Sequence, residues 1–264
     1  MPIGDHRLHR IKPNIIRSVS KNVGINPMAD KRHPRNTVPE NKSNDNEVVK
    51  TPKPTVARID KIEKIWDDEV VYLVGGGPSL ENFDWNRLKG KKVIAINRAF
   101  QVLPFADVMY WTDARFYRWY ASEITNFKGL KVTCRPVPEN PSDVIFLKSN
   151  GANTIDTRPS YISHGNNSGY GAINLAVKLG AKRIYLLGYD MNADSNKTHW
   201  HNGYNISHNT SIYGRMVAQF TPLVDILPRM GVEVWNANPN SKLECFRKCT
   251  IDVAINNNPI KPAQ

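Results

Sequence analysis

The sequence predicts an α/β fold: a Rossmann-like, mostly parallel sheet with helices on both faces, preceded by an extended basic N-terminal arm. From Val70 onward, short β-branched runs alternate with helical stretches, which is typical of a parallel sheet covered on both faces. A glycine-rich turn directly follows the first run. The polar residues that could carry chemistry fall at the ends of the runs, where sheets of this kind bind their ligands.

The expected elements follow from this alternation of apolar runs and helical patterns. Strands are expected over residues 70–74, 93–97, 107–113, 129–134, 143–147, 183–190 and 232–237. Helices are expected over residues 113–126, 169–179 and 212–230. We therefore assign a nucleotide- or phosphate-binding domain to residues 59–250 and a C-terminal tail to residues 251–264.

The first 58 residues differ in composition from the rest of the chain. They are rich in Pro, Asn, Lys and Arg, and they hold +7 of the formal net charge of +12. Such a segment buries too little apolar surface to offset the entropy of ordering it, so we expect an arm that is disordered unless bound to a partner. Its role is open between a solvated extension and a docking arm for a protein partner, for self-association or for nucleic acid. Nucleic acid has the weakest support, because the arm lacks interleaved aromatics for base stacking.

Membrane insertion and disulfide chemistry find no support in the sequence. No apolar run approaches the roughly 18 residues that cross a bilayer. The first thirty residues also lack the apolar centre of a signal peptide, and we expect a cytoplasmic protein. The three cysteines, Cys134, Cys245 and Cys249, are odd in number and too few for a closed zinc site. Reduced thiols are the expected state.

The glycine-rich turn reads Gly75-Gly76-Gly77-Pro78-Ser79-Leu80. Consecutive glycines permit positive φ and close approach of a ligand to the backbone. Pro78 suits a first helical turn, which would leave the Ser79 and Leu80 amides free to meet a phosphate. The dinucleotide fingerprint fails at Leu80 and the Walker lysine is absent, so no NAD is expected. A bare tight turn is the alternative.

Three further strand ends carry polar side chains. Asn97 ends the second expected strand and could read a base or sugar through its paired donor and acceptor. Asp113 ends the third and could accept from a ribose, act as a base, or simply cap the helix that follows. Asp190 ends the strand that follows the long central helix.

The segment around Ser168 and Gly169 predicts a second anion site. These residues open a helix whose first amides would be exposed. The expected helical turn at Pro78 and the helix at Ser168 would then face one crevice with their N-termini, which would suit a diphosphate-bearing substrate.

A polar loop of roughly twenty residues follows Asp190, and loops of that length are usually functional or mobile. Its histidines are His199, His201 and His208, with Lys197 alongside, and His164 lies upstream of the Ser-Gly helix. Histidine is the natural proton donor or acceptor near neutral pH; surface or structural roles are the alternative. A zinc site from His199 and His201 would need a third ligand that the sequence does not nominate, so no zinc is expected.

These segments together resemble a known family. VVYLVGGGPSLENFDWNRLKGKKVIAINRAF with FADVMYWTD resembles the opening of the MptE-like domain, named for archaeal 6-hydroxymethylpterin diphosphokinase. SGYGAINLAVKLGAKRIYLLGYDM with KTHW resembles its second half, and VWNANPNSKLECF its closing segment. Bacterial sialyltransferases that use CMP-sialic acid share a similar glycine-Pro-Ser turn, strand-end Asn and Ser-Gly helix. Similar domains occur in tailed-phage genomes, which would place the protein in the host cytoplasm or the virion.

The resemblance implies a nucleotide-dependent transferase, acting either as a diphosphokinase or by glycosyl transfer from a nucleotide-sugar. It implies nucleotide binding at the residues of the two glycine segments and the strand-end Asn, namely Gly75, Gly76, Gly77, Ser79, Asn97, Ser168 and Gly169. Asp113 and Asp190 would face substrate or a Mg²⁺ ion, and His199 or His201 would be the base. The alternative is a non-catalytic interaction protein, such as a phage virion or assembly component, that docks through the basic arm.

Overall fold

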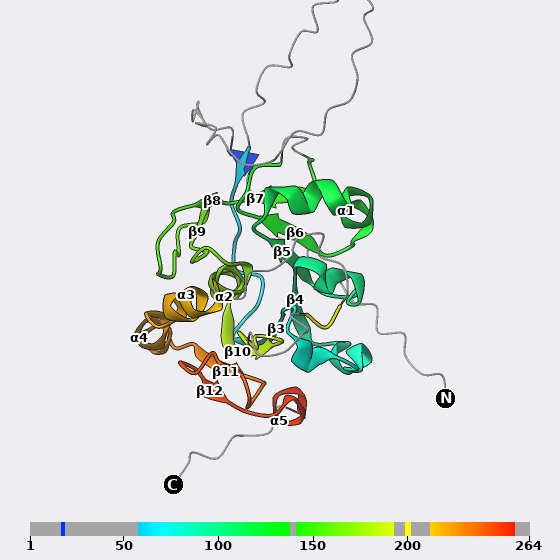
Figure 1. Cartoon of the computed structure of the whole chain (residues 1–264). Coiled ribbons are helices and arrows are strands. Elements are labelled where there is room, and N and C mark those ends of the chain that lie inside the picture. Colours follow the sequence, from blue (N-terminus) through cyan, green and yellow to red (C-terminus); the bar gives the residue numbers. More distant parts are fainter. Residues whose placement is uncertain (1–16, 19–57, 138–140, 193–198, 202–211, 257–264) are drawn as a thin grey trace, which may run out of the picture.

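The computed structural model describes residues 17–18, 58–137, 141–192, 199–201 and 212–256 (Figure 1). Most of the basic arm therefore lies outside the described residues. Its short strand β1 (Arg17–Ser18) pairs antiparallel with β2 (Ile59–Asp60) at the start of the domain.

An eight-stranded sheet forms the centre of the domain, in the order β12-β11-β10-β3-β4-β5-β6-β7. Every pairing between neighbours in this sheet is parallel, which confirms the predicted α/β fold class. Its strands are β3 (Glu69–Val74), β4 (Lys92–Ile96), β5 (Val108–Trp111), β6 (Leu130–Thr133), β7 (Val144–Phe146), β10 (Ala181–Leu187), β11 (Glu233–Asn236) and β12 (Arg247–Lys248). A separate two-stranded sheet pairs β8 (Lys148–Ser149) with β9 (Tyr161–Ile162).

Helices cover both faces of the sheet (Figure 1). They are α1 (Ala114–Asn126), α2 (Ser168–Leu179), α3 (Ile212–Phe220), α4 (Leu223–Arg229) and α5 (Ile251–Asn256), with short 3-10 turns η1 (Pro78–Leu80), η2 (Trp85–Leu88) and η3 (Asn97–Gln101). Along β3, Val71 and Leu73 face a core shared with α2, α3 and α4. Tyr72 and Val74 face a second core shared with α1 and α5. This alternation follows from the two-residue period of a strand.

The strand order reverses direction around β3, the first long strand. The chain proceeds from β3 to β4 on one side and later returns through β10 on the other. The connections therefore diverge at the carboxyl end of β3 and leave a space there, which is the place where open α/β sheets bind ligands.

Two features of the C-terminal region differ from the sequence prediction. The single helix expected over residues 212–230 is two helices, α3 and α4, broken at Thr221 and Pro222. Pro222 has no backbone N–H and its ring clashes with the preceding turn, so the α3 helix cannot continue through it. The segment assigned to a tail begins with α5, whose Ala254 and Ile255 are buried. The Tyr72 hydroxyl donates to the carbonyl of Ala254 at 2.9 Å and ties α5 to the sheet.

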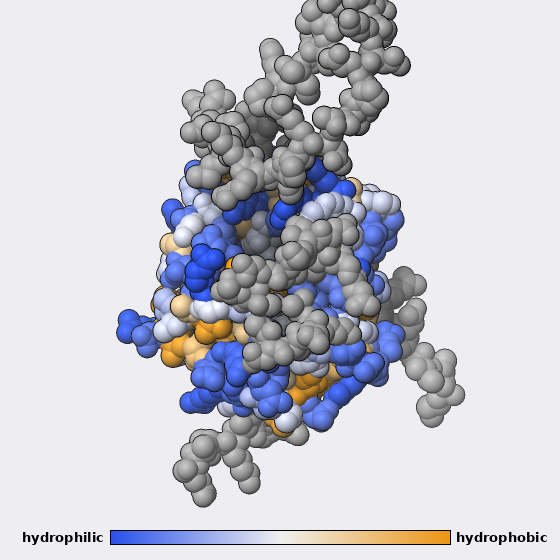
Figure 2. Space-filling model, in the orientation of Figure 1, coloured by the Kyte–Doolittle hydropathy of each residue, from blue (hydrophilic) through white to orange (hydrophobic). Residues whose placement is uncertain are grey.

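The surface is mostly hydrophilic on the face shown in Figure 2, with separate hydrophobic areas. One of these areas lies over α3 and α4, where Val224 is exposed. Among the described residues, no helix combines the length and apolar character needed to span a membrane. Cys134, Cys245 and Cys249 are free cysteines.

Candidate functional site

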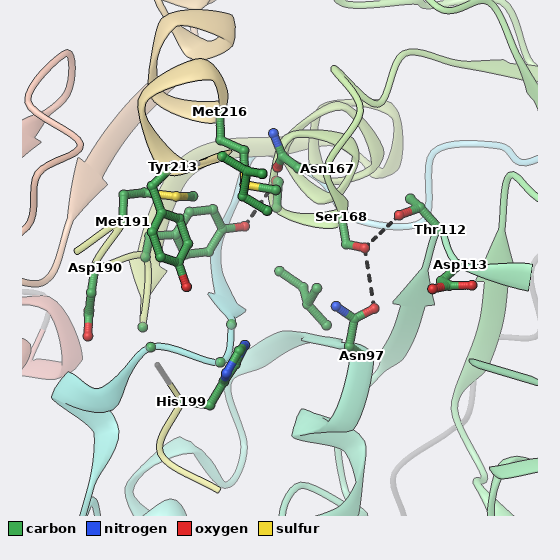
Figure 3. Close-up of a pocket in the computed structure, with 18 of the residues that line it drawn as sticks. Asn97, Thr112, Asp113, Asn167, Ser168, Asp190, Met191, His199, Tyr213 and Met216 are labelled. Carbon is green, nitrogen blue, oxygen red and sulfur yellow. Dashed lines mark hydrogen bonds between the residues drawn. The ribbon is translucent and has the colours of Figure 1, made fainter. Parts of the chain in front are cut away.

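A cavity of about 330 Å³ opens at the carboxyl ends of β3, β4, β5 and β10 (Figure 3). The N-termini of α2 and α3 complete its walls. It is lined by Gly75, Gly76, Gly77, Pro78, Ile96, Asn97, Thr112, Asp113, Phe116, Trp119, Asn166, Asn167, Ser168, Gly169, Gly188, Tyr189, Asp190, Met191, Asn192, His199, Ile212, Tyr213 and Met216. The residues proposed from the sequence to bind the nucleotide or carry catalysis thus line one space, except for Ser79 and His201.

The glycine turn is held against the end of β10. The Gly75 amide donates to the Leu187 carbonyl at 2.8 Å, and the Gly77 amide to the Gly188 carbonyl at 2.9 Å. None of residues 75–77 has a left-handed backbone, so the expected use of positive φ does not occur. The glycines are required for space, because a Cβ on Gly76 would lie 2.7 Å from the His199 ring. The Gly76 amide meets no acceptor within the described part of the chain.

Ser79 binds a protein carboxylate rather than facing the cavity. Its amide donates to Asp190 Oδ2 at 2.7 Å, and its hydroxyl to Asp190 Oδ1 at 2.6 Å. We expected this amide to be free for a phosphate, but the Asp190 carboxylate already occupies the position of the anion. The turn η1 therefore does not supply a second open helix N-terminus.

The N-terminus of α2 does present open amides to the cavity. Asn167 caps the helix, and its Oδ1 accepts from the Tyr170 amide at 2.7 Å. The amides of Ser168 and Gly169 come before the first intrahelical hydrogen bond and line the cavity. The positive end of the helix dipole makes this a favourable place for an anion.

A chain of side-chain hydrogen bonds joins three strand and helix ends (Figure 3). The Ser168 hydroxyl donates to Asn97 Oδ1 at 3.3 Å. Its single proton is thereby used, so in its 2.7 Å contact with Thr112 the threonine hydroxyl is the donor. Asn97 is held in a left-handed backbone conformation, φ 51°, which asparagine tolerates better than most residues. Its Oδ1 is thus occupied, and its amide nitrogen is turned toward the cavity (Figure 3).

The segment 199–201 closes the cavity over the glycine turn. Trp200 donates through its backbone amide to the Gly76 carbonyl at 3.0 Å and through its indole Nε1 to the Gly75 carbonyl at 3.1 Å. This clamp places His199 in the wall of the cavity. His201 stacks on His199 with ring centroids 5.2 Å apart, and its Nδ1 lies 3.3 Å from an Arg98 guanidinium nitrogen. Lys197 and His208 lie outside the described residues.

The two strand-end carboxylates lie on opposite sides of the cavity (Figure 3). Asp113 caps α1 by accepting from the Arg115 amide at 2.9 Å, and it pairs with the Arg115 guanidinium at 2.7 Å. Burial acts to raise the pKa of Asp113, but the hydrogen bonds from Arg115 outweigh it and hold the pKa below its usual range. Asp190 is bound by Ser79 and by Asn238 Nδ2 at 2.8 Å. Both carboxylates are thus engaged with protein donors, and within the described ranges no group of three His, Cys, Asp or Glu could hold a metal ion.

Sequence reasoning missed the apolar wall of the cavity. Tyr213 and Met216 come from α3, and Met191 follows the end of β10. They lie across the cavity from Asn97 and Thr112 (Figure 3). Trp119, on α1, is 38% exposed and also lines the cavity. The spacing of Ile212 and Met216, one helical turn apart, places both on one face, but the sequence alone does not say what that face meets.

Comparisons with known proteins give one structural neighbour. The fold is similar to that of the monofunctional α-2,3-sialyltransferase Cst-I from Campylobacter jejuni, with 17% sequence identity and a TM-score of 0.44 over 73% of this chain and 83% of that chain. No protein-family model matches the chain, and no curated protein sequence matches it. We therefore base the functional proposal on the residues of the cavity itself.

Proposed function

We propose that the protein is a transferase whose donor substrate is a nucleotide-activated compound bound in the cavity. The observation that carries this proposal is the convergence of the open α2 amides, the Asn97 amide group and the His199 ring on one cavity at the sheet edge. Hydrogen-bond donors on one side suit a phosphate, and an imidazole on the other suits proton transfer.

The donor phosphate binds at the amides of Ser168 and Gly169. The helix dipole and these two donors favour negative charge there, and Asn97 Nδ2 adds a third donor from the end of β4. Gly76 contributes an amide and leaves room for the substrate beside His199. The Tyr213 and Met191 wall contacts the less polar part of the donor.

His199 is the base in this proposal. An acceptor hydroxyl oxygen forms the new bond to the transferred group, and the bond from that group to the donor phosphate oxygen breaks. The electron pair leaves with the phosphate, which the α2 amides stabilise, and the hydroxyl proton passes to the His199 imidazole. His201 supports the His199 ring by stacking from outside the cavity lining.

Glycosyl transfer fits the carboxylates better than magnesium-dependent diphosphate transfer. A Mg²⁺ ion held by Asp113 or Asp190 would compete with hydrogen bonds that already use their oxygens. The two groups also face each other across the cavity instead of converging (Figure 3). We accordingly expect transfer activity that survives EDTA, and dependence on Mg²⁺ would favour the diphosphokinase.

Thermal shift against ATP, GTP, CMP, CDP and UDP-sugars, with and without magnesium, tests donor binding. Binding to the folded state raises the melting temperature by mass action, and the responding nucleotide identifies the donor class. Asn97→Asp places an anion beside the phosphate and should weaken that response by roughly tenfold or more in affinity. Asn240→Asp, at an exposed position, is the matched control. No response to any nucleotide would contradict the proposal.

Once the donor is known, two histidine variants test the base. His199→Asn should lower the transfer rate by roughly 100-fold or more, the usual contribution of a positioned base. His201→Asn, which does not line the cavity, should cost much less. Nucleotide binding and melting temperature serve as controls for both variants. Equal losses from the two would remove His199 from the role of base.

A further inference from the structure

A second hollow of about 490 Å³ adjoins the cavity at the ends of β5 and β6. It is lined by Thr112, Asp113, Ala114, Arg135, His164 and Asn166. Thr112, Asp113 and Asn166 line the main cavity as well, so the two spaces meet. The proposed binding site for the donor substrate does not use Arg135 or His164.

His164 is a buried donor that faces this hollow. The residue is only 3% exposed, and its Nδ1 accepts from the Asn166 amide at 3.0 Å. An Nδ1 that accepts a hydrogen bond leaves the proton of a neutral ring on Nε2. Burial lowers the pKa of His164, and the Arg135 charge lowers it further, so the neutral form prevails near pH 7. The ring lines the hollow, so its Nε2–H can donate to a group bound there.

Arg135 brings a positive charge to the same hollow. It lies two residues past the end of β6 and is exposed. Its Nε donates to the Thr112 carbonyl at 3.2 Å. This hydrogen bond holds the Nε side of the guanidinium in place. Its terminal nitrogens make no ion pair with any residue that the structure describes. Asp113, the carboxylate nearby, is instead paired with Arg115.

We propose that this hollow binds an anionic group, a carboxylate or a phosphate, through the terminal nitrogens of Arg135 and the Nε2–H of His164. A guanidinium fork matches the two oxygens of such a group. The Nε2–H of the neutral His164 ring would donate to an oxygen of the same anion. Asn166 adds an exposed side-chain amide at the rim.

The identity of the bound molecule rests on the proposed function. The hollow lies beside the donor cavity and shares Thr112 and Asp113 with it. A second substrate anchored there by its acidic group would extend toward the donor across these two residues. The hollow is therefore the acceptor subsite, and the acceptor is an acidic compound.

Anion titrations followed by NMR of the arginine Nε–H and histidine ring signals test the subsite. Inorganic phosphate and acetate are the probes for the two chemistries, and glycerol is the neutral control. We expect one or both anions, but not glycerol, to shift the Arg135 and His164 signals in a saturable manner. Arg135→Gln should weaken the affinity by roughly tenfold or more. Arg229→Gln removes an equal charge at the exposed end of α4 and should leave it unchanged.

The same titration in the Asn97→Asp variant separates this subsite from the donor cavity. Asn97→Asp disfavours anions at α2, so a response that persists in this variant belongs to the hollow. If Arg135-dependent anion binding occurs while no nucleotide binds, the proposed function fails and the anion site stands. If nucleotides bind but the anions leave Arg135 and His164 unshifted, or Arg135→Gln binds as well as wild type, the subsite is refuted and the donor site stands.

Discussion

Asp113 and Asp190 follow parallel strands at the same edge of the sheet, but their surroundings differ. Asp190 is 6% exposed and binds Ser79 and Asn238, which are 111 and 48 residues away in the chain. Asp113 has a side chain 41% exposed and binds Arg115, two residues ahead. A buried carboxylate with distant partners joins separate segments, whereas an exposed one with a local partner stabilises one helix end. Position at a strand end therefore does not by itself make an aspartate a ligand for substrate.

The largest expected effect follows from removing the Asp190 carboxylate. Asp190→Ala removes the acceptor of three partly buried hydrogen bonds, from the Ser79 amide, the Ser79 hydroxyl and the Asn238 side chain. Because three hydrogen bonds to a charged group are lost, we expect the free energy of unfolding to fall by about 3 kcal/mol. Urea unfolding measures the loss. Asp190→Asn, which keeps one acceptor oxygen, should lose less stability. Equal stability of Asp190→Ala and wild type would refute the proposal that Asp190 joins the segments of Ser79 and Asn238.

A smaller effect is expected from crowding the same contact. A Cβ on Gly77 would lie 2.6 Å from Asp190 Cγ and 2.6 Å from the Gly188 carbonyl oxygen. Gly77→Ala should therefore destabilise the fold by roughly 1–3 kcal/mol, as overpacking does. Gly214→Ala is the matched control, because its Cβ would point into open space on α3 and alanine favours a helix. If the Gly77→Ala protein were as stable as the control, the turn and Asp190 could move apart without loss of stability.

The smallest effect is expected at Asp113, and it depends on pH. Asp113→Asn removes the charge that pairs with Arg115 but keeps a side chain that can cap α1. Since the pKa of Asp113 is lowered in the folded protein, its charge stabilises the fold above the unfolded-state pKa of about 3.9. This contribution is lost as the pH falls through the lower folded-state pKa.

We therefore expect the free energy of unfolding of wild type to exceed that of Asp113→Asn by less than about 1 kcal/mol at pH 7, because the Asp113–Arg115 pair is exposed to solvent. The difference should shrink toward zero below pH 4. Urea unfolding of both proteins across this range measures it. A difference that grows on acidification would contradict the lowered pKa.

The sequence by itself predicted the mostly parallel α/β fold class and the polar residues that follow its main strands. The alternation of β-branched runs with helical patterns is local, and polar residues follow several of the strands, as at Asn97 and Asp190. The single helix expected over residues 212–230 was wrong, because the helical pattern continues on both sides of Pro222 and α4 itself contains Pro228.

Only the tertiary structure decided which polar groups remain available to a ligand. The Ser79 amide is occupied because Asp190 reaches it from a strand 111 residues away, and no local pattern records such a contact. Likewise, the Trp200 clamp places His199 over Gly76 and turns His201 toward Arg98, although the two histidines look equivalent in the sequence. Hydrogen bonds between distant segments depend on how the sheet is assembled, so the availability of each donor is a property of the folded chain.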